Sequence, residues 1–332
     1  MKKYTVAVVG ATGMVGRKML EVLAERKIPV KELVPFASKR SAGSKIDFGG
    51  KEYEVTELTE ENVRERKIDY ALFSAGASVS KKFAPVFSDS GAVVIDNSSA
   101  WRMDDRVPLV VPEVNAHDLN FHGGIIANPN CSTIQAVVAL APLHREFGIK
   151  RIVYSTYQAV SGAGQLGYED LENGIKNEPP KKFPRPIFGN VIPHIDVFLP
   201  SGYTKEEEKM INETRKILGD QTVRITATTV RVPVYYGHSE SVNVEFNKPV
   251  TIEEVREVLS HADGVILIDD PEKGEYPTPR ELAGRDEVFV GRLRRDESVE
   301  SGVNMWIVAD NIRKGAATNA VQILEALIGK NV

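Results

Sequence analysis

The stretch GATGMVG at residues 10 to 16 constrains the fold most, because it stands directly between a β-branched run and a helical pattern. Gly10 permits a tight turn, Gly13 lets the backbone approach a diphosphate, and Gly16 lets the helix pack closely on the strand. The first turn of such a helix offers backbone N–H groups to phosphate. Glycines in such turns can be purely structural, but here position, spacing and flanks agree. We therefore expect a dinucleotide to contact Gly10, Thr12, Gly13, Met14, Val15 and Gly16.

The loop FASKRSAGSK, which follows the second β-branched run, bears on the choice of dinucleotide. An NAD-specific site usually carries an acidic residue here, which holds the ribose 2′-hydroxyl. In this chain Ser38, Arg40 and Ser41 offer hydroxyls and a guanidinium instead, a set that suits a 2′-phosphate. The loop therefore predicts NADP as the cofactor, with a solvated basic loop as the alternative.

The order of the patterns along the chain indicates two domains of different construction. Short β-branched runs alternate with helical patterns over the first half, which is typical of a parallel sheet covered by helices. Beyond residue 150 longer runs such as RIVYSTYQAV and SESVNVEF favour an antiparallel sheet. A chain of 332 residues is long enough for two domains, and the second begins near residue 128. Residues 172–193, rich in proline and asparagine, predict a long irregular excursion, and GAATNAVQILEALI predicts a final amphipathic helix that packs on the first domain.

Composition and charge exclude several classes of function. The net charge is −4, and 42 basic and 46 acidic residues are mixed along the chain, so there is no basic patch for nucleic acid. No apolar run approaches the length of a membrane span, and the N-terminus lacks a signal-peptide cleavage site. The single cysteine cannot form an internal disulfide, which together with the missing export signal predicts a reduced thiol in the cytoplasm. We expect no bound metal.

The one cysteine of the chain, Cys131, stands in NPNCSTIQ, residues 128 to 135. A lone cysteine is by default a small buried hydrophobe. Here, however, Asn130 and Cys131 lie at the start of a helical pattern, where the positive end of the helix dipole lowers a thiol pKa. A thiolate beside a nicotinamide cofactor suggests a thiohemiacetal that is oxidised to a thioester. We therefore expect Cys131 to be the nucleophile of an oxidoreductase.

A thiolate nucleophile needs a proton acceptor, and the chain has six histidines. His238 follows a glycine in RVPVYYGHSES and stands among Ser239, Glu240 and Ser241. That setting predicts an exposed general base. The other five lie in loop or helix-surface contexts without comparable neighbours: His117, His122, His144, His194 and His261.

Several motifs occur in the order and spacing of bacterial aspartate-semialdehyde dehydrogenases, and the likeness covers essentially the whole chain. They are GATGMVG, FASKRSAG, DNSSAWRMD, NPNCSTIQ, YQAVSGAG, RVPVYYGHSES and DNIRKGAATNAVQI. NPNCS together with RVPV..GHS is highly specific, whereas the glycine fingerprint is shared with many unrelated dehydrogenases. The resemblance implies a reversible, NADPH-dependent reduction of L-4-aspartyl phosphate to L-aspartate 4-semialdehyde and phosphate. This reaction serves the biosynthesis of diaminopimelate, lysine, threonine and methionine.

The resemblance also implies roles for individual residues of the catalytic centre. Cys131 resembles the acyl-thioester nucleophile and His238 the general acid and base. Gln158 resembles a residue that positions the substrate beside Asn130. Arg231 resembles the clamp for the substrate α-carboxylate, a task that suits a forked guanidinium.

Further residues resemble contacts of the family to substrate, phosphate and cofactor. In KEEEKM, Glu206 resembles an acid that faces the substrate amine and Lys209 a cation that faces phosphate, although by composition this segment is a solvated helix face. Arg102 resembles a phosphate-binding arginine, with Ser99 nearby. Three more residues resemble the family's contacts to the nicotinamide half of the cofactor: Ser161, Gly162 and Asn311.

The architecture that the resemblance implies has two domains. One is a Rossmann-type NADP-binding domain of residues 1–127 and 310–332, to which the C-terminal helix returns. The other, residues 128–309, is an α+β catalytic and dimerisation domain of the glyceraldehyde-3-phosphate dehydrogenase-like type. Family members assemble as homodimers through the catalytic domain, and the sequence leaves a tetramer open.

Two other functions compete with this one. N-acetyl-γ-glutamyl-phosphate reductase performs the same thioester chemistry on a longer acylated substrate, but its cysteine environment differs from NPNCSTIQ. The second alternative is a catalytically inactive protein of the same fold, which senses NADP and acts through partner proteins. The presence of Cys131, Gln158, Arg231 and His238 argues against the sensor.

Overall fold

The computed structural model describes residues 2–329, which divide into two compact units. Unit 1 takes in the described residues up to Pro129 and those from Ala316 onward, and unit 2 runs from Asn130 to Gly315. These limits lie a few residues after the predicted ones at 127/128 and 309/310. Residues 1 and 330–332, which the predicted first domain included, lie outside the described residues.

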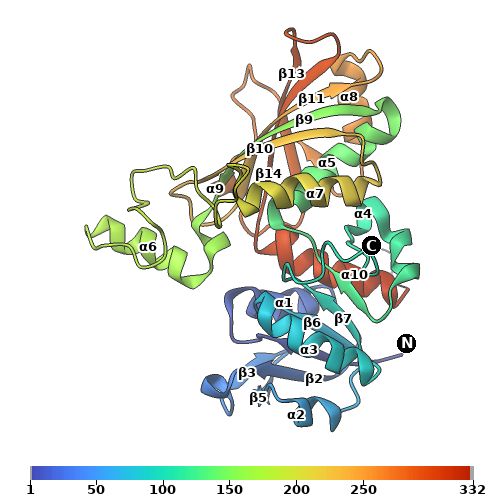
Figure 1. The fold of residues 1–332 in the computed structure, drawn as a ribbon, viewed down its shortest axis with the longest axis vertical. Coiled ribbons are helices and arrows are strands. Elements are labelled where there is room, and N and C mark those ends of the chain that lie inside the picture. The colour runs from blue at the N-terminus through green and yellow to red at the C-terminus, as the bar shows by residue number, and fades with distance from the viewer. Residues whose placement is uncertain (1, 330–332) are drawn as a thin grey trace. The chain divides into compact units, whose positions relative to one another are not determined.

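Unit 1 is built on a parallel sheet of six strands (Figure 1). Its strand order is β5 (Thr56–Glu57), β2 (Val30–Ala37), β1 (Tyr4–Val9), β6 (Tyr70–Phe73), β7 (Val93–Asp96) and β8 (Ile125–Ala127). The hairpin of β3 (Lys45–Phe48) and β4 (Lys51–Glu54) forms a small separate sheet. The chain order of the large sheet is that of the Rossmann fold, and dinucleotides bind beyond the strand ends where the order reverses. Here that point lies between β1 and β6.

Helices cover both faces of this sheet, because β1 is apolar on both sides. Val6 and Val8 share an apolar cluster with α1 (Met14–Glu25) and α10 (Asn319–Leu327). Ala7 and Val9 share another with α2 (Glu60–Arg64) and α3 (Ala77–Asp89). Such alternation follows from the two-residue period of a strand that is buried on both faces. The short helix α4 (Pro112–Asn115) contacts α10, so the predicted C-terminal helix belongs to unit 1.

The turn between β1 and α1 is built as the glycine spacing requires. Gly10 has a φ of +83°, which favours glycine, and a Cβ there would lie 2.9 Å from the Oγ of Ser74, the residue after β6. A Cβ on Gly16 would collide with the carbonyl oxygen of Gly10. Gly13 is exposed and no side chain caps the first turn of α1. The N–H groups of that turn are therefore available to a phosphate.

Unit 2 contains a second sheet of six strands, and this sheet is mixed (Figure 1). Its order is β10 (Arg224–Arg231), β9 (Ile149–Gln158), β11 (His238–Phe246), β14 (Gly302–Ala309), β13 (Val288–Asp296) and β12 (Val265–Leu267). The prediction of an antiparallel sheet is wrong for two pairs, because β10 runs parallel to β9 and β12 runs parallel to β13. The connections explain the difference. Between β9 and β10 the chain forms α6 (Gln165–Ile175) and α7 (Lys205–Leu218), a crossover long enough to return it in the same direction.

Three helices cover one face of the mixed sheet. α5 (Cys131–Phe147) packs on β9, β11, β13 and β14, and α7 packs on α5 and β10. α8 (Ile252–Ser260) packs on α5, β12 and β13, while the short α9 (Pro279–Leu282) contacts β14. Residues 176–204 form an irregular excursion, which contains only isolated bridges. The predicted bounds of 172–193 are wrong, because residues 172–175 end α6 and the irregular chain continues to residue 204. None of the helices in the described part of the chain combines the length and apolar character that a membrane crossing requires.

We expect Gly16→Ala to destabilise the fold by roughly 1–3 kcal/mol, because the added methyl group meets backbone atoms of Gly10, which cannot move aside as a side chain does. Urea unfolding followed by circular dichroism measures the effect. Gly76→Ala is the matched control, since Gly76 also precedes a helix of unit 1 but a Cβ there meets nothing within 4 Å. Equal stability of the two variants would show that α1 does not require this close approach.

Candidate active site

Asn130 is the N-cap of the helix that begins with Cys131. Its Oδ1 accepts hydrogen bonds from the backbone N–H groups of Ser132 at 3.0 Å and Thr133 at 3.3 Å. The cap satisfies two N–H groups of the first turn. Cys131 is half-buried and is the first residue of α5. The thiol therefore lies at the positive end of a 17-residue helix, where the thiolate is favoured.

Two carboxylates of α7 accept hydrogen bonds from Asn130. Glu213 Oε2 accepts a hydrogen bond from the Asn130 backbone N–H at 2.6 Å. Glu206 Oε1 accepts one from Asn130 Nδ2 at 2.9 Å and another from Gln158 Nε2 at 3.1 Å. The structure thus brings the predicted residues Asn130, Gln158 and Glu206 together. Glu213 is not among the residues predicted from the sequence, although its place seven residues after Glu206 puts both on one helix face.

Glu206 forms an ion pair with Lys209 and remains an anion. Its Oε2 lies 3.0 Å from Lys209 Nζ, and that ammonium also reaches Asp196 at 2.8 Å. Burial alone would raise the pKa of Glu206, but Lys209 and the amide donors of Asn130 and Gln158 outweigh burial and hold the pKa at about 2. The site therefore contains a fixed negative charge beside the helix that carries the cysteine.

The run of three glutamates in α7 separates into three environments. Glu206 faces the site, whereas Glu207 forms a capping box with Thr204 and accepts a hydrogen bond from the Thr229 backbone at 3.0 Å. Glu208 is half-exposed. The composition of this segment predicted a solvated face, and this is wrong for Glu206, Glu207 and Glu213, because packing of α7 on α5 and β10 buries them.

His238 is completely buried, so the prediction of an exposed base is wrong. It is the first residue of β11 and pairs with Ala309 of β14, which directs its side chain inward. Its Nδ1 accepts a hydrogen bond from the Ala159 backbone N–H at 3.0 Å, while Nε2 has no partner within residues 2–329. Burial and the nearby Arg231 lower the pKa of His238 to about 3, although Glu206 opposes them. The imidazole is therefore neutral near neutral pH.

Arg231 ends β10 next to His238. The side chain is buried, its Nη1 donates to the carbonyl oxygen of Ala159 at 2.6 Å, and its guanidinium lies 5.7 Å from the ring centre of Phe183. Nε has no partner in the part of the chain that the structure describes. A Cβ on Gly162 would lie 2.9 Å from Arg231 Nη1 and 3.1 Å from His238 Nε2. Glycine at position 162 thus keeps open a space that both side chains border.

Ser161 and Asn311 contact each other next to the start of β11. The Ser161 hydroxyl contacts Asn311 Oδ1 at 3.3 Å and accepts a hydrogen bond from Asn311 Nδ2 at 3.1 Å. Asn311 Oδ1 also accepts one from the backbone N–H of Gly237, the residue before His238. These two predicted cofactor contacts therefore brace the start of β11 in the present structure.

The predicted phosphate-binding residues Arg102 and Ser99 belong to unit 1. Arg102 is buried, and its guanidinium donates to the carbonyl oxygens of Asn128 at 3.0 Å and Asn97 at 2.9 Å. Ser99 is exposed. The hydrogen bonds to the backbone orient the guanidinium of Arg102.

The SKRS loop of unit 1 follows β2 as a short 3₁₀ turn. Ser38 occupies the N-cap position of this turn, Lys39–Ser41, but its side chain makes no capping hydrogen bond. Arg40 is exposed and makes no hydrogen bond or ion pair with any residue between 2 and 329. Its guanidinium is therefore available to a ligand. The same range contains no cluster of three or more His, Cys, Asp or Glu side chains that could hold a metal ion.

Glu240 is a buried ionisable residue to which none of these contacts gives a role. It points to the same side of β11 as His238, and both carboxyl oxygens lack a hydrogen-bond partner within the described residues. Burial raises the pKa of Glu240 well above its ordinary value, so the carboxyl is held in its neutral form.

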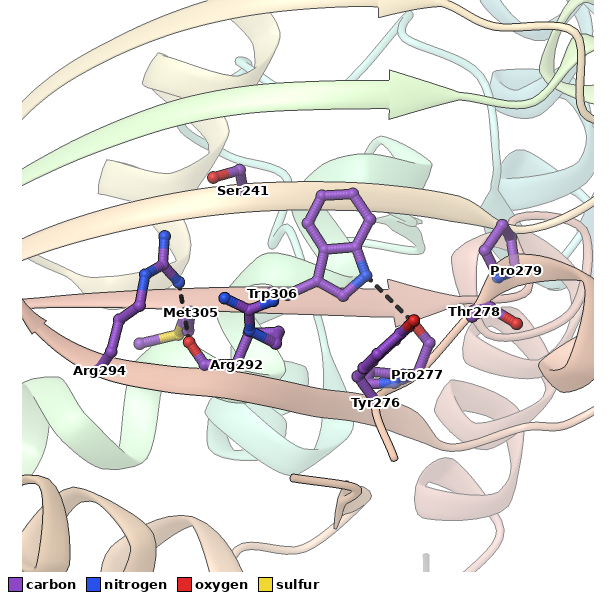
Figure 2. Close-up of a pocket in the computed structure, with 9 residues that line it drawn as sticks. All are labelled: Ser241, Tyr276, Pro277, Thr278, Pro279, Arg292, Arg294, Met305 and Trp306. Carbon is purple, nitrogen blue, oxygen red and sulfur yellow. Dashed lines mark hydrogen bonds between the residues drawn. The ribbon is translucent and has the colours of Figure 1, made fainter. Parts of the chain in front are cut away.

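The face of the mixed sheet opposite α5 is only partly covered. Along β9 the buried Tyr154 and Thr156 alternate with the more exposed Ser155 and Tyr157. Tyr157 lies beside Trp306 of β14, with 5.4 Å between ring centres. This face contains a hollow of about 440 Å³. Figure 2 shows the residues that line it: Ser241, Tyr276, Pro277, Thr278, Pro279, Arg292, Arg294, Met305 and Trp306.

Comparisons with known proteins give consistent results. The model of the semialdehyde dehydrogenase NAD binding domain matches residues 5–122, and that of the semialdehyde dehydrogenase dimerisation domain matches residues 140–314. Aspartate-semialdehyde dehydrogenase of Aquifex aeolicus is 60% identical, with 98% of both chains covered. A crystal structure of aspartate semialdehyde dehydrogenase II from Vibrio cholerae complexed with ASA has a TM-score of 0.94 at 47% identity, covering 100% of both chains. Aspartate semialdehyde dehydrogenase from Candida albicans, solved with NADP, has a TM-score of 0.78 at 26% identity, covering 98% of this chain and 99% of that one.

We expect Glu240→Gln to stabilise the protein progressively more as the pH rises. The folded chain keeps the Glu240 proton at pH values where the unfolded chain has released it. The stability that this proton contributes is complete below the ordinary glutamate pKa of 4.5 and is lost as the pH rises toward the folded pKa. The wild type should therefore lose stability relative to the variant between about pH 5 and about pH 8, measured as urea midpoints.

Glu245→Gln, on the opposite side of the same strand, is the matched control. Lys150 lowers the pKa of Glu245 through a side-chain hydrogen bond, so that carboxylate is already ionised in both folded and unfolded chains over this pH range. Its effect should not change with pH. A pH-independent difference between the wild type and Glu240→Gln would contradict a neutral, buried Glu240.

Proposed function

This chain belongs to the aspartate-semialdehyde dehydrogenase family, and we propose that Cys131 is the nucleophile of its reaction. The enzyme interconverts L-4-aspartyl phosphate and L-aspartate 4-semialdehyde, in the biosynthesis of the aspartate family of amino acids. The single observation that carries the proposal is the placement of the thiol. Cys131 begins α5 directly after its cap, and Arg231 interacts electrostatically with it.

In the reductive direction the Cys131 thiolate attacks the acyl carbon of aspartyl phosphate, and phosphate leaves from the tetrahedral adduct to give a thioester. When bound, NADPH supplies the hydride that reduces this thioester. Breaking of the C–S bond then releases the aldehyde and the thiolate. His238, which borders the same space as Arg231, acts on the oxygen of the adduct as the family's acid and base. The reduced thiol that this chemistry needs fits an enzyme of the cytoplasm.

Substrate recognition would use the charged groups of the site. The buried Arg231 is proposed to pair with the α-carboxylate, since its Nε lacks a partner in the described chain and a guanidinium can bind a carboxylate through two N–H groups. Glu206, an anion, is proposed to face the α-amino group, and Gln158 and Asn130 are positioned through it. For phosphate we propose Lys209 and, from unit 1, Arg102 and Ser99.

NADP is the proposed cofactor, bound by the turn between β1 and α1. The positive φ of Gly10, the close approach at Gly16 and the uncapped first turn of α1 fit a dinucleotide diphosphate. Thr12, Met14 and Val15 belong to the same turn, and Ser38, Arg40 and Ser41 would hold the 2′-phosphate. Ser161, Gly162 and Asn311 are proposed contacts to the nicotinamide half.

A homodimer is proposed through the uncovered face of the unit 2 sheet, and a tetramer would require a further surface. The matched dimerisation domain comprises residues 140–314, which include every strand of this sheet. Its outer side carries the half-exposed pair of Tyr157 and Trp306 and the hollow of Figure 2. Large apolar and aromatic groups that are exposed together on a sheet face are typical of a protein interface.

Cys131→Ala should reduce kcat to less than about a thousandth of the wild-type value, because removal of a covalent nucleophile normally costs at least this much. NADP affinity, measured by calorimetric titration, should be nearly unchanged. Ser132→Ala is the matched control, since the Ser132 hydroxyl has no partner within residues 2–329 and only its backbone takes part in the cap. An alanine variant at position 131 that kept more activity than this would rule out the covalent mechanism.

Arg40→Asp should lower kcat/KM for NADP by roughly two orders of magnitude, about 2.7 kcal/mol, because a carboxylate repels the 2′-phosphate. The same carboxylate can accept hydrogen bonds from the ribose of NAD, so the preference should invert. Steady-state kinetics with both cofactors measure it. Lys39→Asp, which makes the same type of charge change one residue earlier, is the control and should have a smaller effect. An unchanged NADP preference in Arg40→Asp would mean that this loop does not read the 2′-phosphate.

Ser241→Arg should convert the homodimer to monomers, because Ser241 pairs with Ser155 and Trp306 in the middle of the outer sheet face. Sedimentation velocity measures the assembly. Ser260→Arg is the control. Ser260 is exposed at the end of α8, a helix that lies with α5 on the other face of the sheet. A dimer that withstands the change at position 241 would place the interface elsewhere.

A further inference from the structure

The aromatic ring of Phe183 lies next to the guanidinium group of Arg231, although Phe183 belongs to the irregular excursion and Arg231 to the mixed sheet. The distance from Arg231 Cζ to the ring centre is 5.7 Å, which is within the range of a cation–π interaction. This interaction is stronger when the cation is shielded from water, and Arg231 is buried. The ring therefore forms one wall of the space that holds the Arg231 side chain.

Asp170 of α6 holds the backbone of the segment that carries Phe183. Its carboxylate oxygens accept hydrogen bonds from the N–H groups of three successive residues, Lys181 at 2.7 Å and Lys182 and Phe183 at 2.8 Å. Asp170 is almost completely buried, a setting in which a carboxylate needs such hydrogen bonds. The three bonds give a segment without regular secondary structure a fixed position on α6.

The helix α6 also leaves room for the ring itself. Gly167 is three residues before Asp170, so the two residues lie on one helix face. A Cβ on Gly167 would lie 3.2 Å from Phe183 Cζ and 2.5 Å from the carbonyl oxygen of Val160. The ring packs against a buried apolar cluster, which consists of Val160, Leu171, Ile187 and Ile192. The position of Phe183 is therefore determined by its surroundings on α6 as well as by Arg231.

An aromatic neighbour holds Arg231 in place without occupying its hydrogen-bond donors. Nη1 donates to the carbonyl oxygen of Ala159, while Nε has no partner within residues 2–329. A carboxylate or amide side chain in place of the ring would accept hydrogen bonds from the guanidinium, whereas a ring stabilises the cation and leaves the N–H groups free. Because these N–H groups form a rigid fork, the orientation of the guanidinium decides whether it can pair with a carboxylate.

We propose that Phe183 is a positioning residue for Arg231, which acts through this side chain on recognition of the substrate α-carboxylate, and that Asp170 anchors it. The ring also keeps water from the guanidinium, which strengthens its attraction to a carboxylate. The inference rests on the proposed pairing of Arg231 with the α-carboxylate. It gives the irregular excursion a part in the selection of the substrate.

A comparison of two aldehydes tests the role of Phe183. 3-Aminopropanal is L-aspartate 4-semialdehyde without the α-carboxylate, so the ratio of kcat/KM for the semialdehyde to kcat/KM for 3-aminopropanal reports on carboxylate recognition. Oxidation with NADP and phosphate measures both values. Phe183→Leu should lower the ratio roughly tenfold, chiefly through a higher KM for the semialdehyde. Phe183→Tyr keeps the ring and should retain the wild-type ratio. Phe188→Leu, the same change at an exposed ring of the excursion, is the control and should also retain it.

Asp170→Asn tests the anchor independently of the ring. The amide replaces one carboxylate oxygen by an N–H donor, which cannot accept the backbone N–H groups of the segment. The ratio should therefore fall, as in Phe183→Leu. Asp269→Asn is the matched control, because the buried Asp269 side chain also accepts backbone N–H bonds, from Arg292 and Leu293, and it should leave the ratio unchanged.

Arg231→Leu separates failure of this inference from failure of the proposed function. If Arg231 pairs with the α-carboxylate, this variant should lose most of the ratio. Loss of the ratio in Arg231→Leu but not in Phe183→Leu and Asp170→Asn would overturn the role of Phe183 alone. An equal loss of activity with both aldehydes in Phe183→Leu would also overturn it, since a general structural defect acts on both substrates. An unchanged ratio in Arg231→Leu would contradict the proposed carboxylate clamp, and the inference with it.

Discussion

The active site depends on the hydrogen bonds that hold Asn130 between two helices. Its side-chain oxygen caps α5, while its amide and its backbone N–H bind Glu206 and Glu213 of α7. One residue thus fixes the first turn of α5, which begins with Cys131, relative to α7, which carries Glu206 and Lys209. Because Glu206 and Glu213 are two helical turns apart on one face of α7, they reach Asn130 together. Cys131 takes its position from this arrangement.

The ionisable side chains of the site avoid the free-energy cost of an unpaired buried charge in different ways. Glu206 is buried but has Lys209 and two amides around it, which explains why its pKa falls in spite of desolvation. Arg231 has one bond to a backbone carbonyl and keeps Nε for a ligand. His238 avoids the cost of a buried charge by remaining neutral. The site thus contains a cation in Arg231 and an anion in Glu206, the charges that we propose to pair with the carboxylate and the amine of the substrate.

The local part of this arrangement could be predicted from the sequence, and the non-local part could not. The glycine turn and the helix start at Cys131 follow from short-range rules, because turn conformation and capping involve residues a few positions apart. Strand direction in unit 2 depends on the crossover through α7, so the strand patterns alone predicted the wrong relative direction for β9 and β10. Burial of His238 and Glu206 depends on helix packing far along the chain. No sequence signal marks the Ala159 backbone, since any residue except proline offers the same N–H.

Mass spectrometry of the intact protein after mixing with aspartyl phosphate, in the absence of NADPH, tests the central claim most directly. If Cys131 is the nucleophile, each chain should gain one aspartyl group, and peptide mapping should locate it on Cys131. Addition of NADPH should then remove the adduct as the aldehyde is released. Rapid turnover without any adduct, or an adduct on another side chain, would contradict the account.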